Sequence, residues 1–133
     1  MQWRKYVDAD YEVIAPWFIE HGWEMPPDRG ALPTIGFIVE DDDGPCGCAF
    51  LYITNSPLAW CEWICTAPRL GRKGFRVLEY LLTQVKKAAT DIGVQRIVHL
   101  SNPKYRKVFE KRLGFQFAEK ADVLIWSVEN ASS

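Results

Sequence analysis

The order of two kinds of sequence pattern constrains the fold of this chain more than any other feature. Three short apolar segments separated by turn residues come first, at Thr34–Glu40, Cys46–Thr54 and Trp60–Thr66. A long stretch with apolar residues at helical spacing then begins at Gly74, and a short strand pattern, Arg96–Leu100, follows it. Antiparallel strands followed by a strand–helix–strand crossover predict one mixed sheet.

Further segments extend this pattern at both ends. Gln2–Tyr6 is the predicted first strand, and a helix from Asp8 or Asp10 toward His21 follows it. Pro16 lies within that helix and is expected to kink or split it. The remaining predicted elements are a helix from Ser101 or Asn102 to Leu113 and a final hairpin of Phe115–Phe117 and Val123–Val128.

The size of the chain fits one domain over residues 1–133, of the α/β class (α+β mixed). The 133 residues are 48% apolar, which is enough for one core with a mostly antiparallel sheet and helices on both faces. No stretch approaches the roughly 18 apolar residues of a membrane span. The first residues lack the apolar region of a signal peptide. We therefore expect a cytoplasmic protein with no membrane partner.

Four cysteines, Cys46, Cys48, Cys61 and Cys65, lie in the predicted sheet. If the turn at 55–59 sets the register, Cys48 and Cys65 lie close together on adjacent strands. Structural zinc sites typically use cysteine pairs on turns, two to four residues apart. Buried thiols are therefore the preferred interpretation, and no metal site is predicted.

Charge is divided unevenly along the chain. Residues 1–68 contain three Lys or Arg and eleven Asp or Glu, whereas residues 69–112 contain twelve basic and three acidic side chains. Such a split indicates an anionic ligand for the middle block. A solvated basic helix face explains the same pattern, and both interpretations stay open.

The segment from Thr66 to Arg76 carries the strongest chemical signal. It leaves a strand, passes Gly71 and Gly74, and enters the long helix. The N–H groups and dipole of a first helical turn attract anions, and glycine allows phosphate to approach the backbone closely. The spacing fits neither a Walker loop nor a dinucleotide fingerprint. The basic residues of the segment are Arg69, Arg72, Lys73 and Arg76.

At this point the chain resembles the GNAT superfamily of acyl-CoA-dependent N-acyltransferases. The segment Pro68–Phe75 resembles the pyrophosphate loop of that family, and the segment from Asn102 to Phe115 is similar to its second motif. The order of elements agrees as well. Two departures stand out: Gly71 replaces the usual Gln or Arg, and Arg76 replaces a small residue.

The resemblance implies acetyl-CoA as the acyl donor and assigns roles to the matching positions. The N–H groups of the glycine loop would bind the CoA pyrophosphate, with electrostatic support from its basic side chains. The implied cofactor-binding residues are Ile64, Thr66, Arg69, Gly71, Arg72, Lys73, Gly74, Phe75, Arg76, Asn102 and Phe109. Phe109 or Glu110 stands near the place of a tyrosine that often protonates the departing thiolate. Phenylalanine cannot donate a proton, so Tyr105, one helical turn earlier, is the nearest substitute.

Glu62 is the only acidic residue of the segment Trp60–Thr66 and shares a predicted face with Trp60 and Ile64. An acceptor amine must lose a proton before it attacks a thioester, so we expect Glu62 to act as general base. A structural ion pair is an equally weighted alternative.

The acceptor, a primary amine of a small molecule or protein, is expected at the loop before the second predicted strand. The acidic first half of the chain favours a cationic acceptor there. The predicted acceptor-binding residues are Trp23, Glu24, Met25, Asp28, Arg29 and Trp60.

Two other functions are alternatives to acetyl transfer. A catalytically silent module of the same fold is favoured by the departures at Gly71, Arg76 and Phe109. Nucleic-acid binding through Arg69–Arg76 and Lys104–Arg112 ranks well below both. Homodimer formation stays open.

Overall fold

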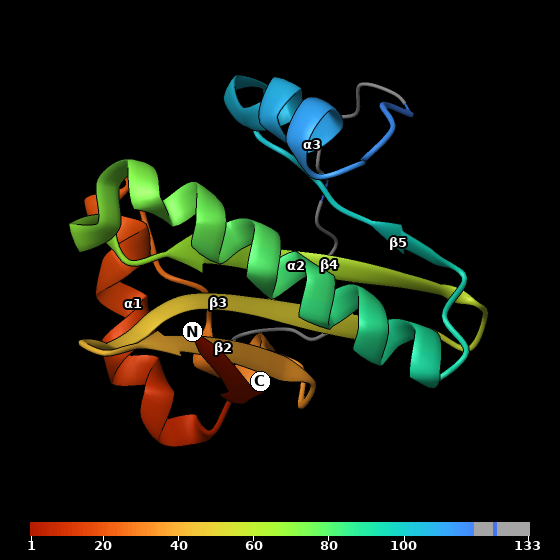
Figure 1. The fold of residues 1–133 in the computed structure, drawn as a ribbon. Coiled ribbons are helices and arrows are strands. Elements are labelled where there is room, and N and C mark those ends of the chain that lie inside the picture. The colour runs from red at the N-terminus through yellow and green to blue at the C-terminus, as the bar shows by residue number, and fades with distance from the viewer. Residues whose placement is uncertain (119–123, 125–133) are drawn as a thin grey trace. The chain divides into compact units, whose positions relative to one another are not determined.

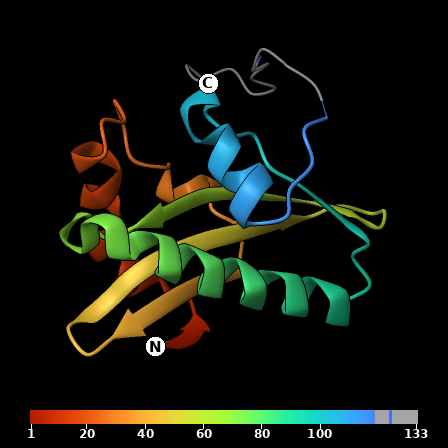
Figure 2. The same cartoon turned by 45° about the horizontal axis from the view of Figure 1, so that its top comes forward.

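The computed structural model describes residues 1–118 and residue 124. The chain separates into two compact units, Met1–Asn102 and Pro103–Ser133. Figures 1 and 2 show the elements of both units from two directions. None of the described helices combines the length and the apolarity needed to cross a bilayer.

Five strands form one sheet in the first unit. They are β1 (Gln2–Lys5), β2 (Gly36–Asp41), β3 (Gly44–Ile53), β4 (Leu58–Thr66) and β5 (Arg96–Val98), and they lie side by side in this order. Neighbours from β1 to β4 are antiparallel, whereas β4 and β5 are parallel. Parallel neighbours need a crossover connection, which the long helix provides. The predicted mixed, mostly antiparallel sheet is confirmed.

Helix α2 (Gly74–Asp91) is this crossover connection. Its buried positions Val77, Leu81 and Val85 recur at helical spacing, as predicted, and form the stripe that packs on the sheet. Gly93 follows the helix with a φ of 87°, a left-handed conformation that suits a helix cap.

Helix α1 (Tyr11–Glu20) runs without a break through Pro16, so the predicted split does not occur. Proline removes the hydrogen bond to the carbonyl four residues earlier, which belongs to Glu12. Pro16 and Glu12 are both exposed, so water can bind that carbonyl in place of the missing donor.

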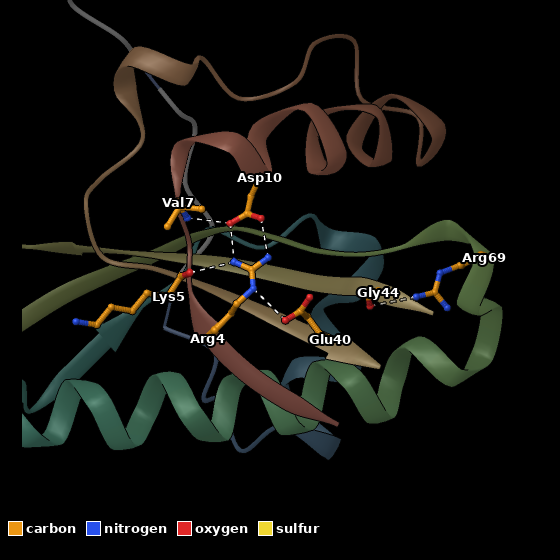
Figure 3. Close-up of polar contacts among 7 residues, drawn as sticks. All are labelled: Arg4, Lys5, Val7, Asp10, Glu40, Gly44 and Arg69. Atoms are coloured by element: carbon orange, nitrogen blue, oxygen red, sulfur yellow. Dashed lines mark hydrogen bonds and ion pairs between the residues drawn. The ribbon is translucent and has the colours of Figure 1, made fainter. Parts of the chain in front are cut away.

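Helices α1 and α2 cover opposite faces of the sheet, as Figure 3 shows. On the α2 face Gly47 leaves room for the helix, because a Cβ there would lie 2.8 Å from Val77 Cγ1. On the other face Gly36 leaves room for Phe50, whose ring would lie 2.8 Å from an added Cβ. The sheet is therefore buried on both sides, with Phe18 of α1 fully buried against the second face.

The second unit contains helix α3 (Arg106–Arg112), which follows a short 3-10 turn. Gly114 ends it with a φ of 77°, and the Phe115 N–H donates to the Phe109 carbonyl at 3.0 Å. The prediction of a strand at Phe115–Phe117 is wrong, because these residues are irregular and Phe115 is bound to the helix end. The other half of the predicted hairpin, 123–128, lies outside the described residues except for Leu124.

A charged network fastens the N-terminal strand to α1 and β2 (Figure 3). The guanidinium of Arg4 donates to both carboxylate oxygens of Asp10, at 2.7 and 2.8 Å, and to Glu40 at 3.0 Å. Asp10 also accepts the Val7 N–H at 2.8 Å, and its side chain is only 8% exposed. Hydrogen bonds from Arg4 hold the pKa of Asp10 below its usual value.

We expect Asp10→Asn to lower the free energy of unfolding by about 2 kcal/mol at pH 7, because it weakens the charged hydrogen bonds of the carboxylate with Arg4 and Val7. The folded-state pKa of Asp10 lies below the unfolded one, so its stabilisation is present at neutral pH. It is lost as the pH falls below about 4 and through the folded-state pKa. Urea unfolding across this range measures both effects. Asp42→Asn, at an exposed carboxylate of the β2–β3 turn, is the control and is expected to change little.

Candidate active site

A bulge in the middle of β4 shapes the candidate site. Phe50 pairs with Glu62, and Cys48 pairs with Cys65, so β4 has one residue more than β3 over the same length. Trp63, inside this bulge, has a φ of 54°. A left-handed conformation is a true outlier for a bulky residue and costs on the order of 1–3 kcal/mol.

Three sets of contacts hold Trp63 in this conformation. Its indole N–H donates to the Tyr52 hydroxyl at 2.9 Å, and its carbonyl accepts the Cys48 thiol at 3.5 Å. Its ring centroid lies 5.6 Å from that of Trp23 and 6.1 Å from that of Phe18. The surrounding packing thus compensates for the strain.

Strands β4 and β5 stop pairing after Trp60 and Val98, close to the bulge. Beyond this point His99 Nδ1 lies 2.8 Å from the Cys61 carbonyl, and the Leu100 N–H donates to Glu62 Oε1 at 2.8 Å. A carbonyl can only accept, so Nδ1 of His99 carries a proton. Two side chains therefore bridge the strands where the ladder ends.

The Glu62 carboxylate lies at this point of divergence. It is 22% exposed, and Oε1 lies 3.5 Å from His99 Nδ1. Glu62 and Trp60 share one face, as predicted, because their partners on β3 are two residues apart. Ile64 does not follow that alternation, because the extra residue of the bulge interrupts it.

A basic loop (Pro68–Lys73) connects β4 to α2 through 3-10 turns. Within it Gly71 has φ 54° and ψ −127°, a combination that side chains disfavour. The first turn of α2 has no side-chain cap and no acidic residue. Gly74 is buried against the end of β4, since a Cβ there would lie 2.9 Å from Thr66 Oγ1. The dipole and the N–H groups of this helix end thus favour an anion at the end of β4.

The basic residues of this loop differ in their partners. Arg72, Lys73 and Arg76 are exposed. Arg69 instead donates to both carboxylate oxygens of Asp41, at 2.8 and 3.0 Å. Its guanidinium also lies 3.5 Å from the Gly44 carbonyl, a contact drawn in Figure 3. Arg69 therefore ties the basic loop to the β2–β3 turn.

The predicted acceptor residues are only partly brought together. Trp23 lies against Trp63, with 45% of its surface exposed. Asp28 accepts the Gly30 N–H at 3.0 Å and so caps a local turn. Arg29 is bound to Glu12 at 2.7 Å. The other predicted acceptor residues are Glu24 and Met25, both exposed, and Trp60, which is half-buried on β4.

Two predicted site residues belong to the second unit. Tyr105 is exposed, with Lys104 Nζ 5.5 Å from its ring centroid. Phe109 is buried and its ring lies 5.2 Å from that of Phe115. Asn102 is exposed at the end of the first unit. Phe109 thus has the environment of a core residue.

The four cysteines are buried thiols, as predicted. Cys48 and Cys65 are partners on adjacent strands and so lie close together, as predicted. Burial raises the pKa of Cys65 and of Cys61 to about 12, so neither is a thiolate nucleophile at neutral pH. Within the described part of the chain, no group of three or more His, Cys, Asp or Glu could hold a metal ion.

Sequence reasoning missed His99 and Trp63. The sequence analysis assigns no role to His99, although its position at the end of the parallel strand beside β4 links it to Glu62. It assigns none to Trp63 either, because nothing in the sequence marks the bulge. His21 was also missed; its Nε2 lies 2.8 Å from the Thr66 carbonyl and joins the end of α1 to the end of β4.

Comparisons with known proteins agree with this arrangement. A model of the acetyltransferase (GNAT) family matches residues 2–115. Among curated proteins, none matches the chain.

Solved structures share the fold at low sequence identity. Rv2747 from Mycobacterium tuberculosis, in complex with CoA, is 18% identical with a TM-score of 0.75, over 93% of this chain and 76% of that one. N-acetylglutamate synthase from Neisseria gonorrhoeae, complexed with coenzyme A and N-acetyl-glutamate, is 24% identical with a TM-score of 0.70. The match covers 84% of this chain and 27% of the synthase. An acetyltransferase of Trypanosoma brucei is 16% identical with a TM-score of 0.70, over 94% and 99% of the two chains.

Proposed function

Because the chain belongs to the acetyltransferase (GNAT) family, we propose that it is an N-acetyltransferase that transfers an acetyl group from acetyl-CoA to a primary amine. One observation carries the proposal: strand β4 joins an anion site to a carboxylate. The uncapped N-terminus of α2 lies against Thr66 at the end of the strand, and Glu62 lies where β5 diverges from it. A long ligand with a diphosphate and a reactive group fits such a strand.

The basic loop supplies what a diphosphate requires. Backbone N–H groups at the start of α2 would donate to it, and Arg72 and Lys73 would add charge from the same loop. The buried Gly74 lets the helix end approach the strand without a side chain between them. Ile64 would offer its backbone to the pantetheine arm, because β5 no longer pairs with β4 at that level.

Glu62 is the proposed general base. An ammonium acceptor gives a proton to the carboxylate, and the free amine attacks the thioester carbonyl. The C–N bond forms, the C–S bond breaks, and the CoA thiolate leaves and takes up a proton. Tyr105 as the donor of that proton rests on the family resemblance alone.

Several features stay predictions. The family match covers residues 2–115 and so includes parts of both units. One domain over 1–133, a cytoplasmic location and homodimer formation stay predictions. A silent CoA-binding module is the second candidate, and the core environment of Phe109, which cannot donate a proton, favours it.

Calorimetric titration with acetyl-CoA tests the cofactor site. We expect micromolar binding by the wild-type protein and a Kd about tenfold higher in the Arg72→Ala/Lys73→Ala variant, because hydrogen bonds to charged groups are lost. Lys86→Ala/Lys87→Ala removes the same charge from exposed positions later in α2 and is the matched control. Absence of binding at millimolar acetyl-CoA by the folded protein would contradict the proposal.

A further inference from the structure

The side chains of Phe18, Trp23 and Trp63 form an aromatic wall, and Trp63 directly follows Glu62 in β4. From this wall we propose that the acceptor is a primary amine joined to an aromatic ring by a short alkyl chain; the ring packs on Trp23 and Trp63 while the nitrogen approaches Glu62. The inference rests on the proposed acetyl transfer and adds the chemical class of the acceptor.

The aromatic wall has a buried side at Phe18 and a solvent-exposed side at Trp23. Phe18 is fully buried. The centroid of its ring lies 5.1 Å from that of Trp23, with an angle of 82° between the ring planes, and 6.1 Å from that of Trp63, with an angle of 78°. The two indoles lie 5.6 Å apart at 45°. Gly22, with a φ of 96°, turns the chain so that the backbone N–H of Trp23 donates to the Phe18 carbonyl at 3.0 Å. Trp23 is thus fixed in place although 45% of its surface is exposed.

The polar atoms around Trp63 already have partners. The indole N–H of Trp63 donates to the Tyr52 hydroxyl at 2.9 Å, and that hydroxyl donates to the Ala31 carbonyl at 3.1 Å. What this part of the wall offers a ligand is therefore ring surface rather than a hydrogen bond. Aromatic rings bind such a surface by edge-to-face or offset contacts.

The wall and the proposed base lie on the same face of the sheet. Tyr52 pairs with Trp60, and Phe50 pairs with Glu62, so these four side chains point to the α1 face. Trp63 directly follows Glu62 in β4 and packs against Phe18 of α1. An amine beside the Glu62 carboxylate can therefore carry its ring toward the indoles.

The charge around the wall favours a cation. Arg29 is the only lysine or arginine between Lys5 and Arg69. Its guanidinium donates to Glu12 at 2.7 Å and lies over the Tyr11 ring. In the described part of the chain, Glu20 and Glu24, on either side of the Trp23 turn, have no ion-pair partner. An ammonium ion is attracted to this surface and a carboxylate is repelled.

The backbone strain at Trp63 points the same way. A bulge that needs a φ of 54° is most easily made with glycine. Tryptophan has a higher conformational energy than glycine at this φ, so its presence here indicates that the large ring itself has a role. Strain of this kind occurs preferentially at ligand sites.

A matched pair of amines tests the inference on the unmodified protein. In calorimetric titrations of the CoA-saturated protein, we expect 2-phenylethylamine to bind about 2–10-fold more tightly than 2-cyclohexylethylamine, which has the same amine but no aromatic ring. Trp23→Ala should remove this preference and Trp23→Phe should keep most of it. Trp3→Ala, at an exposed tryptophan of β1, is the control and should leave it unchanged.

The outcomes separate the two proposals. Equal affinities for the two amines, or an unchanged preference in Trp23→Ala, would overturn the aromatic acceptor. If acetyl-CoA binds but neither amine does, this inference fails and the acyl-CoA site stands. If neither acetyl-CoA nor amine binds, both are wrong.

Discussion

Glu62→Gln is expected to lower kcat for acetyl transfer by about 10²–10⁴-fold, the usual contribution of a general base. Glutamine keeps the size of the side chain, and its carbonyl oxygen can still accept the Leu100 N–H that Glu62 binds at 2.8 Å. The variant therefore removes the charge and the basicity with little change of fold. Rapid-quench measurement of a single turnover with bound acetyl-CoA gives the chemical step directly.

The same variant decides between the two interpretations of Glu62. A structural ion pair with His99, 3.5 Å away, would show itself as a loss of stability with an unchanged chemical rate. If Glu62 is a general base, the variant instead has a lower rate of the chemical step, an unchanged stability and an unchanged Kd for acetyl-CoA. Asp91→Asn, an exposed acid at the end of α2, controls for a general charge effect and is expected to keep full activity.

Elements with a regular local period could be predicted from the sequence. Helix α2 repeats its apolar residues at 3.6-residue spacing, and β2 to β4 are separated by turns rich in Gly, Asp and Pro. The proximity of Cys48 and Cys65 followed from counting outward from one turn. The exact pairing did not, because the bulge between Glu62 and Cys65 shifts it by one residue, from Ile64 to Cys65.

The shape of the candidate site could not be predicted in the same way. The bulge inserts one residue without any glycine or asparagine to mark it, so strict alternation did not hold for Ile64. The contact of His99 with the Cys61 carbonyl depends on a parallel pairing between segments 38 residues apart. Contacts of this kind arise from tertiary packing, to which local sequence patterns are blind.

The partner of Arg69 could also not be predicted from the sequence, and this contact leads to a further prediction. Its charge and its place in the basic loop indicated phosphate binding, but its bidentate partner in the structure is Asp41, 28 residues earlier. Asp43 lies 3.8 Å away on the same turn. This geometry predicts that Arg69 acts as a positioning residue, which holds the basic loop against the β2–β3 turn.

We expect Arg69→Asp to raise the Kd for acetyl-CoA roughly 100-fold, because juxtaposed like charges on the loop and the turn repel each other and displace the basic loop. The reversed pair, Asp41→Arg/Arg69→Asp, should recover most of the affinity, since it restores the attraction between loop and turn. Arg69→Lys should fall between them, as a lysine cannot form the bidentate contact. Calorimetric titrations of the four proteins measure the coupling as a double-mutant cycle.

The reversed pair separates positioning from direct contact. If Arg69 touches a phosphate of CoA, an aspartate at position 69 repels that phosphate whatever residue stands at position 41, and the double variant stays as weak as Arg69→Asp. If Arg69 acts through Asp41, only the relative sign of the two charges matters. Recovery of affinity would therefore leave phosphate binding to the helix N-terminus and to Arg72 and Lys73, whose side chains are exposed.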